Sequence, residues 1–144
     1  MEKRQHYQRL EHMYHEHPLN RVFKAKLTVQ ERQTELVIPV SPTLFHAANA
    51  VHGAVYFKAL DDAAFFAANS IVFDVFVLTT TFTIYLTRPV SSGELRSVGR
   101  LVNQNKSQFV AEAILYNDGK EVGRGSGIYV RSKLLLSEVP SYSL

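Results

Sequence analysis

Residues 53–70 constrain the fold more than any other segment, because they form a long helix-like stretch with almost no polar face. The apolar residues in it are Ala54, Val55, Tyr56, Phe57, Ala59, Leu60, Ala63, Ala64, Phe65, Phe66, Ala67 and Ala68. A helix that is apolar nearly all round is a buried helix. Lys58, Asp61 and Asp62 interrupt the stretch, so it does not resemble a membrane span. The sequence therefore predicts a buried central helix.

Strand-like runs stand on both sides of this helix. Two of them precede it, at residues 23–29 and 35–40, and a loop leads from them into the helix. Four longer runs follow it, at residues 75–87, 94–103, 108–116 and 121–131. Turn-forming residues separate the later runs, and Asp118-Gly119 is typical of a type I′ hairpin turn. The pattern predicts an antiparallel meander after the helix.

The whole chain, residues 1–144, is predicted to form a single α+β domain. No internal repeat, linker or low-complexity segment divides it. A short amphipathic helix is expected within residues 1–19, where apolar residues recur at helical spacing until Pro18. One buried helix with two strands before it and four after it implies a sheet wrapped around a single helix.

The composition excludes several classes of function. The chain has no cysteine, which rules out disulfides, thiolate nucleophiles and cysteine-ligated zinc. The net charge is only +3 and no basic stripe is interleaved with aromatics, so we expect no nucleic-acid partner. Four histidines crowd the N-terminal helix without the carboxylate pattern of a known metal site, so no metal is predicted. The polar N-terminus does not resemble a signal peptide, and we expect a cytoplasmic protein without a membrane partner.

Asp61 has surroundings that local pairing does not explain. Its neighbours four positions away on either side are Phe57 and Phe65, so it lies in an apolar stripe of the helix. Asp62, in contrast, has Lys58 four positions earlier, at the spacing of a helix-surface ion pair. An unpaired carboxylate among aromatics is costly to bury. Asp61 is therefore expected either to pair with an arginine from another strand or to serve in catalysis.

His52 and Gly53 stand where the loop enters the central helix. The N–H groups at a helix N-terminus are unpaired and carry partial positive charge, so they can stabilise a developing oxyanion. A glycine there lets a ligand approach the backbone closely. The same residues are also compatible with a turn glycine and a histidine that caps or packs against the helix.

Asp61 and Gly53 are too far apart on one helix to act on the same carbonyl group. Eight residues separate them, which is roughly 12 Å along the helix axis, whereas a base or nucleophile must come within about 3 Å of its target. If both belong to one site, they must come from two subunits with antiparallel central helices. We therefore expect a homo-oligomer, either a dimer or a tetramer, with the active site at the subunit interface.

Residues 51–64, with the sequence VHGAVYFKALDDAA, resemble the helix signature of PaaI-like hotdog thioesterases, in which His-Gly precedes an Asp or Glu by nine positions. The spacing from His52 to Asp61 matches. The run Leu86-Thr87-Arg88-Pro89 resembles the end of a family strand, and residues 119–125 resemble the last hairpin. The resemblance covers roughly residues 20–132 and implies the hotdog fold, with acyl-CoA as the substrate.

The resemblance also implies a role for each matching residue. Asp61 looks like the nucleophile or general base that attacks the thioester directly or through water, and the Gly53 N–H looks like the oxyanion donor. His52 would orient the thioester. Thr79 would assist the carboxylate from the next strand, with Thr80 and Thr81 as near alternatives.

One departure from the family concerns the carbonyl contact. The family often has an asparagine six positions before the histidine, where this chain has His46; either His46 substitutes for it, Asn49 serves from a shifted loop, or the contact differs. Phe57 is one of several aromatics that would accept an aryl or a medium aliphatic acyl group alike. Among the basic residues, Arg88 and Arg124 are candidates for the CoA phosphates.

The expected function is therefore hydrolysis of an acyl-CoA thioester to the free acid and CoA. No dinucleotide fingerprint or phosphate-binding loop is present, so no cofactor is implied beyond the CoA half of the substrate. One alternative is a non-catalytic acyl-CoA-binding hotdog module. Another is an acyl-thioester hydratase or dehydratase, which is disfavoured because no histidine follows Asp61 on the helix.

Overall fold

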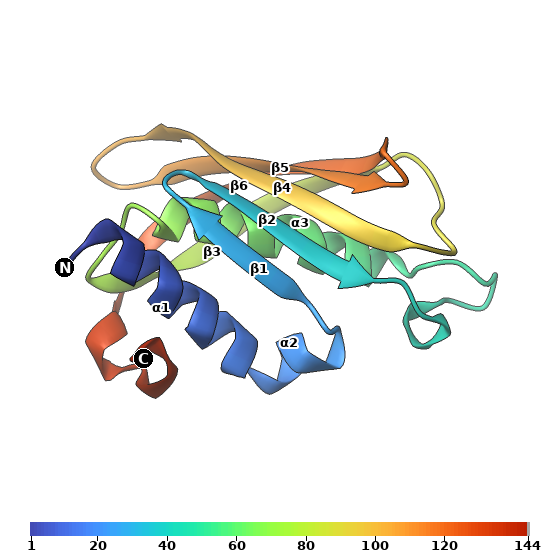
Figure 1. Cartoon of the computed structure of the whole chain (residues 1–144). Helices are drawn as coiled ribbons and strands as arrows, with labels where there is room; N and C mark the ends of the chain where they lie inside the picture. Colours follow the sequence, from blue (N-terminus) through green and yellow to red (C-terminus); the bar gives the residue numbers. More distant parts are fainter. Residues whose placement is uncertain (144) are drawn as a thin grey trace.

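A computed structural model of the chain describes residues 1–143, in which six antiparallel strands curve around one long helix (Figure 1). The strands are β1 (Lys26–Gln30), β2 (Gln33–Pro39), β3 (Val75–Leu86), β4 (Glu94–Gln104), β5 (Phe109–Asn117) and β6 (Lys120–Leu135). Their order in the sheet is β1-β2-β4-β5-β6-β3. The central helix α3 (Gly53–Asn69) lies against one face of the sheet. The predicted α+β architecture is confirmed, and α3 ends within one residue of its predicted bound.

The N-terminal segment forms two helices rather than one. α1 (Lys3–Glu16) and α2 (Pro18–Val22) are joined at His17. Proline is favoured at the first position of a helix because its missing N–H would have no partner there. The N-terminal helix ends before Pro18 as predicted, and the second helix, which begins at Pro18, was not predicted. The first strand begins at Lys26 rather than at residue 23.

The N-terminal helix and the end of the chain are fastened together beside the central helix. His6 on α1 is fully buried. Its Nε2 donates to the Asn69 carbonyl oxygen at 2.9 Å, so its Nδ1 accepts from the Tyr142 hydroxyl at 2.6 Å. Tyr142 belongs to the last of three 3₁₀ helices, η1 (Pro42–Leu44), η2 (Leu136–Glu138) and η3 (Pro140–Tyr142). These contacts place α1 and the C-terminal segment beside α3.

Small residues let α3 lie unusually close to the sheet. Ala59, Ala63 and Ala67 are fully buried. A Cβ atom on Gly99 of β4 would lie 2.2 Å from the Ala63 carbonyl oxygen, so only glycine fits at that position. The Thr34 hydroxyl on β2 donates to the same carbonyl oxygen at 2.5 Å. The position of α3 over the sheet is therefore fixed by backbone contact.

One stripe of α3 is left incompletely covered. Phe57 is 40% exposed, and Asp61 and Phe65 are partly exposed along the same face. This stripe faces β3, which pairs with β6 on one side and lies at the end of the sheet order. Exposed apolar side chains also occur on β3, namely Leu78, Tyr85 and Leu86. The helix predicted to be buried all round is thus open beside the unpaired edge of the sheet.

Candidate active site

Asp61 lies in the middle of α3 and is held by two hydroxyl groups from neighbouring strands. The Tyr129 hydroxyl on β6 donates to Asp61 Oδ1 at 2.9 Å, and the Thr79 hydroxyl on β3 donates to the same oxygen at 3.2 Å. Neither an arginine nor a lysine forms an ion pair with Asp61 among residues 1–143. Of the two explanations for this carboxylate, pairing with an arginine is therefore wrong for the single chain.

The surroundings of Asp61 raise the pKa of its carboxyl group. Burial raises the pKa of the Asp61 carboxyl above its ordinary value, and the hydrogen bond from Tyr129 lowers that pKa in part. The neighbouring charge of Asp62 raises it further, while Thr79 and Lys58 lower it. A raised pKa makes a carboxylate a stronger base, which favours acceptance of a proton during a reaction.

Asp62 has the structural role that its spacing predicts. Lys58 Nζ lies 2.9 Å from Asp62 Oδ2, and the Tyr14 hydroxyl on α1 donates to the same oxygen at 2.7 Å. Lys58 also donates to the Asn20 side-chain oxygen at 2.6 Å. The two adjacent carboxylates therefore have different contacts. Asp62 binds Tyr14 of α1 directly and Asn20 of α2 through Lys58, whereas Asp61 accepts hydrogen bonds from hydroxyl groups alone.

A β-bulge in β3 brings Thr79 to Asp61. Thr79 pairs with Tyr129 and Thr81 pairs with Ile128, so Thr80 is the extra residue. Without the bulge, Thr79 and Phe82 would point to opposite faces, because side chains alternate along a strand. With it, Thr79 contacts Asp61 and Phe82 packs on Phe57, at 5.5 Å between ring centroids. Bulges commonly re-aim side chains beside active sites.

Thr80 is therefore directed away from the carboxylate. Its hydroxyl donates to the Ile128 carbonyl oxygen at 3.0 Å. Of the three threonines expected near Asp61, Thr79 is the one whose hydroxyl donates a hydrogen bond to it among residues 1–143.

Asp61 and Thr79 line an apolar pocket of about 440 Å³. Three aromatic side chains, those of Phe65, Phe66 and Phe76, form one wall of it. The other lining residues come from α3, the N-terminal segment, the end of β6 and the C-terminal segment, namely Asp62, Met13, Tyr14, His17, Leu19, Asn20, Leu134, Val139 and Ser141. A concave apolar site with few convergent polar groups is the usual form of a small-molecule site.

A second hollow of about 390 Å³ lies at the N-terminal end of α3. It is lined by His46, Ala50, Val51, Gly53, Tyr56, Leu86, Thr87, Arg88 and Pro89. His52 caps the helix, because its Nδ1 accepts from the Ala54 N–H at 2.9 Å. The Gly53 N–H makes no hydrogen bond within the part of the chain that is described, so it remains free to bind a ligand.

Of the two candidates for the family asparagine, only His46 lines this hollow. Asn49 is exposed and adopts φ 63°, a left-handed conformation that asparagine tolerates in turns. The structure therefore gives Asn49 a turn position and brings His46, Gly53 and Arg88 together.

The hollow beside Gly53 and the pocket beside Asp61 share no lining residue. On a single chain the two predicted catalytic groups are thus separated, as the helix length requires. Phe57 lies between them on α3, partly exposed.

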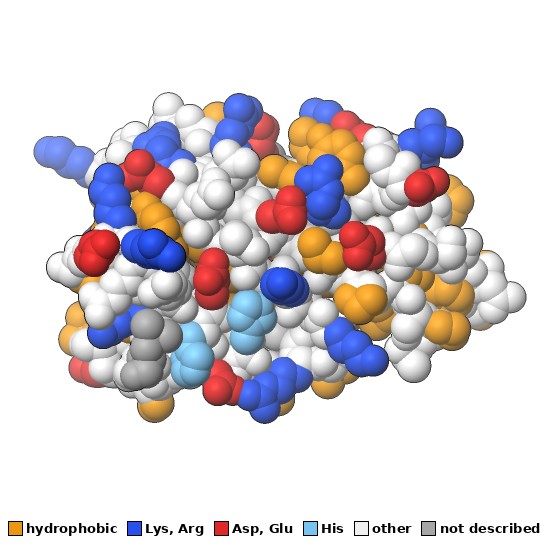
Figure 2. Space-filling view, in the orientation of Figure 1, with side chains coloured by type: hydrophobic (Ala, Val, Ile, Leu, Met, Phe, Trp, Pro, Cys, Tyr) orange, Lys and Arg blue, Asp and Glu red, His pale blue; other side chains and the backbone are white. Residues whose placement is uncertain are grey.

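Arg124 lies outside both hollows. Its guanidinium is exposed and bonded to both Glu121 carboxylate oxygens, at 2.7 and 2.8 Å. Charged residues of both signs are interspersed over the face shown in Figure 2, so that face carries no basic stripe.

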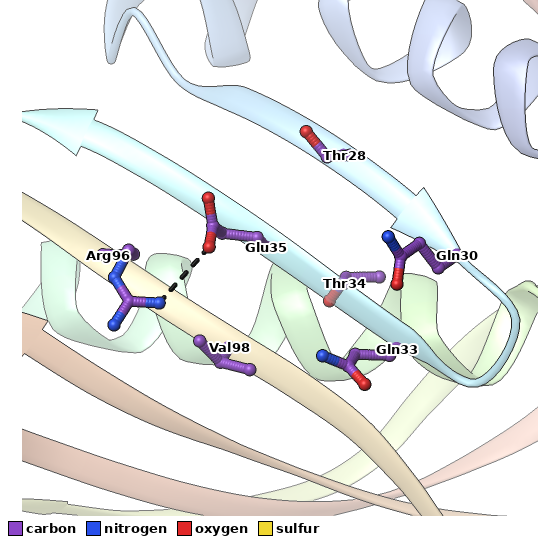
Figure 3. A pocket seen from close by; sticks show the side chains of 7 residues that line it. All are labelled: Thr28, Gln30, Gln33, Thr34, Glu35, Arg96 and Val98. Carbon is purple, nitrogen blue, oxygen red and sulfur yellow. Dashed lines mark hydrogen bonds and ion pairs between the residues drawn. The ribbon is translucent and has the colours of Figure 1, made fainter.

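A further hollow of about 260 Å³ lies on the outer face of the sheet, over β1, β2 and β4 (Figure 3). Glu35 and Arg96 point toward each other there, with 3.3 Å between Oε2 and the guanidinium. None of the residues predicted to act in catalysis lines this hollow.

Tyr129 is not among the residues that the sequence predicts to act in catalysis. By alternation along β6, Tyr129 lies on the same face as Gly123, Gly125 and Gly127. A Cβ on Gly125 or Gly127 would lie within 2.7 Å of the Phe82 ring, so these glycines make room for Phe82 within the chain. A tyrosine following a run of inward-facing glycines was the available signal, but nothing in the sequence indicates that its hydroxyl meets Asp61.

The N-terminal histidines are used in structural contacts. His12 Nδ1 donates to the Ser141 carbonyl oxygen at 2.7 Å, and His15 Nε2 accepts from the Leu27 N–H at 2.9 Å. No group of three or more potential metal ligands occurs among residues 1–143. No helix within that range is long and apolar enough to cross a membrane.

Solved structures with the same fold include several bacterial proteins. The PaaI protein of the Escherichia coli phenylacetic acid degradation operon aligns with a TM-score of 0.84 at 20% identity, over 92% of this chain and 97% of that one. A phenylacetic acid degradation-related protein of Ralstonia eutropha, described as a putative thioesterase, gives 0.76 at 17% identity, over 87% and 98%. A mutant of the phenylacetic acid degradation protein PaaI of Thermus thermophilus gives 0.74 at 17% identity, over 81% and 100%.

These similarities confirm the predicted hotdog fold. No curated protein sequence matches the chain. The family model of the thioesterase superfamily matches residues 48–123, which include α3 with both Gly53 and Asp61, and which make up more than half of the 144 residues. The chain is therefore a member of the thioesterase superfamily.

Proposed function

We propose that the protein hydrolyses an acyl-CoA thioester to the free acid and CoA, with Asp61 as its catalytic carboxylate. The observation that carries the proposal is the state of Asp61. It is a partly buried carboxylate without a cationic partner among the described residues, its pKa is raised by burial, and it lines an apolar pocket of about 440 Å³. Membership of the thioesterase superfamily supports the reaction type.

A second copy of the chain would complete the site. β3 is a twelve-residue strand at the end of the sheet, and an unpaired edge of that length readily pairs with another strand. The exposed apolar residues Leu78, Tyr85 and Leu86 lie on it, and Phe57 is exposed on the neighbouring helix α3. Antiparallel pairing of β3 with β3 of a second copy would cover both the edge and the open stripe of α3.

The contacts of β3 with α3 suggest the register of that pairing. Asp61 contacts Thr79, and Phe57 contacts Phe82. A Cβ on Gly53 would lie 3.2 Å from Leu86 Cδ1, so Leu86 is the residue of β3 that lies beside Gly53 of α3. Phe82 stands roughly midway between Thr79 and Leu86. A twofold axis near Phe82 would therefore bring Asp61 of one subunit to Gly53 of the partner subunit.

In the proposed reaction, Asp61 takes a proton from a water molecule, and the oxygen of that water bonds to the thioester carbonyl carbon. The Gly53 N–H of the partner subunit donates a hydrogen bond to the carbonyl oxygen as negative charge develops there. The C–S bond then breaks, the proton held by Asp61 passes to the departing sulfur, and CoA leaves as its thiol. Direct attack by Asp61, followed by hydrolysis of the resulting anhydride, gives the same products. Neither route needs a cofactor.

In this proposal, each of the two hollows binds a different part of the substrate. The acyl group would occupy the apolar pocket beside Asp61, whose far walls come from α1, α2 and the C-terminal segment. The pantetheine arm would pass the hollow beside Gly53 of the partner subunit, where Arg88 would meet the CoA phosphates. His46 would face the thioester from the same hollow. Arg124, which is bonded to Glu121, takes no part in this arrangement.

Thiol release from short aliphatic, medium aliphatic and aryl acyl-CoA esters tests the proposal. Asp61→Asn preserves the side-chain shape but removes the base, and should lower kcat by about 10² to 10⁴-fold. Glu35→Gln, the same chemical change on the outer face of the sheet (Figure 3), should leave kcat unchanged. An Asp61→Asn protein with wild-type turnover on its best substrate would refute the assignment.

The same panel distinguishes the alternatives. A wild-type protein that binds a non-hydrolysable acyl-CoA analogue in calorimetry, yet releases no thiol from any ester, would be a binding module instead. Loss of the conjugated double bond of an enoyl-CoA would indicate a hydratase.

A further inference from the structure

We infer that Tyr129 is a positioning residue for the reaction: with Thr79 it holds Asp61 Oδ1, so that Oδ2 is the oxygen presented to the substrate. The inference rests on the proposed catalytic role of Asp61 and extends it to one atom. It also assigns a role to a fully buried tyrosine on β6, outside residues 48–123 that match the family model.

Both hydroxyl donors reach the same carboxylate oxygen. Tyr129 donates to Oδ1 at 2.9 Å and Thr79 donates to Oδ1 at 3.2 Å. Within residues 1–143, no group donates a hydrogen bond to Asp61 Oδ2. A carboxylate fixed at one oxygen keeps the other free for a water molecule or a carbonyl carbon, while its rotation about the Cβ–Cγ bond is restrained. Restraint of this kind keeps a reacting atom in its productive geometry.

The strands place the two donors as a cross-strand pair. Thr79 on β3 is directly opposite Tyr129 on β6, at the start of the bulge that ends with Thr81. Side chains of such a pair lie about 5 Å apart at their Cβ atoms, so two hydroxyls can converge on one oxygen above them. The bulge therefore serves the carboxylate by making Thr79 and Tyr129 neighbours on the face toward α3.

Packing around the ring restrains the Tyr129 hydroxyl, which lies 2.9 Å from Asp61 Oδ1 and 3.5 Å from the Asp61 carbonyl oxygen. Its ring meets Phe65 edge-on, with 5.8 Å between centroids and 87° between planes. A Cβ on Gly127 would lie 3.1 Å from the Tyr129 hydroxyl and 2.9 Å from the Thr81 carbonyl oxygen. The missing side chain at Gly127 thus provides the space in which the hydroxyl reaches Asp61.

The electrostatic setting keeps Tyr129 a donor. Burial, followed by the charge of Asp61, raises the pKa of the Tyr129 phenol far above its ordinary value, so it remains protonated. A hydrogen bond donated to a carboxylate favours the ionised form. The other titratable or charged groups around Asp61 come from α3 and from the N-terminal segment, and they are Lys58, Asp62, Tyr14 and His17.

The decisive measurement is the pKa of Asp61, followed by the ¹³C NMR signal of its labelled carboxyl group and assigned with Asp61→Asn. In Tyr129→Phe this pKa should rise, because a hydrogen bond to the ionised form is lost. Thr79→Val should raise it less, since Tyr129 has the larger lowering effect. Tyr142→Phe is the matched control, because it also loses a buried phenol hydrogen bond, the one to His6, and should leave the Asp61 pKa unchanged.

Kinetics supply a second readout on the same proteins. Tyr129→Phe should lower kcat by about tenfold to a hundredfold with KM nearly unchanged, and the acid limb of its pH profile should move to higher pH. Tyr142→Phe should match wild type in both respects. An unchanged Asp61 pKa together with an unchanged pH profile in Tyr129→Phe would overturn this inference while the proposed hydrolysis survives. A wild-type protein without thioesterase activity would overturn the proposed function instead.

Discussion

Gly127→Ala should damage the site and the fold together, because the added methyl group enters the space shared by Phe82, Thr81 and Tyr129. Its Cβ would lie 2.4 Å from Phe82 Cδ1, 2.9 Å from the Thr81 carbonyl oxygen and 3.1 Å from the Tyr129 hydroxyl. The Phe82 ring can turn away, but the Thr81 carbonyl belongs to the β3 bulge and moves only with the strand. Overpacking of this kind costs about 1–3 kcal/mol, of which the lower backbone entropy of unfolded alanine offsets about 0.5 kcal/mol.

The expected net loss is about 2 kcal/mol of unfolding free energy, or roughly 6 °C in Tm, with a fall in kcat because Thr79 and Tyr129 shift from Asp61. Thermal unfolding at fixed protein concentration and thiol release measure the two effects. Gly119→Ala is the control: Gly119 has φ 73° with nothing within 4 Å of an added Cβ, so alanine strains the turn without touching the site. A Gly127→Ala protein as active as Gly119→Ala would refute the reasoning.

Two further outcomes follow from the structure. Burial lowers the pKa values of His6 and His15, so both favour the neutral form in the folded protein. The stability they contribute is present above about pH 6.5, and it is lost as the pH falls through their lowered folded pKa values. Chemical denaturation at several pH values should show this loss, and it should be smaller in His6→Gln; a stability independent of pH between 7 and about 5 would contradict it. Leu78→Lys places a charge on the unpaired edge of β3, where it should oppose strand pairing; light scattering should then give a smaller particle with reduced activity, whereas an unaltered assembly would argue against pairing through β3.

Much of the fold could be predicted from hydrophobic periodicity. The apolar run from Gly53 predicts α3 almost to its last residue, and Asp118-Gly119 predicts the hairpin between β5 and β6. The second N-terminal helix was missed because five residues from Pro18 are too few for a periodic signal. The C-terminal 3₁₀ helices were missed for the same reason.

The part of the candidate site that depends on neighbours along the helix could be predicted from the sequence. The two phenylalanines at four-residue spacing identified Asp61 as the unusual carboxylate, and Lys58 identified Asp62 as the paired one. Tyr129 is 68 residues from Asp61 in the chain, and its contact depends on the β3–β6 register and on the bulge at Thr80. Tertiary contacts of this kind cannot be predicted from hydrophobic periodicity in the sequence. The exposure of Phe57 was also unforeseen, because an apolar residue has the same sequence signal whether its own chain or a second copy covers it.

In the proposed function, one active site combines Asp61 of one subunit with Gly53 of its partner subunit. Gly53→Pro removes the N–H with little disturbance, since proline is favoured at the first helical position and His52, at φ −64° and ψ 143°, already has the conformation preferred before proline. Asp61→Asn and Gly53→Pro homo-oligomers should both be inactive.

A heterodimer of the two variants, purified through two different tags, tests the claim most directly. If each site spans two subunits, one of its two sites holds both defects and the other holds none. We expect about half of the wild-type activity per dimer. Activity no higher than that of the two inactive parents would show that Asp61 and Gly53 act within one subunit, and would contradict the claim.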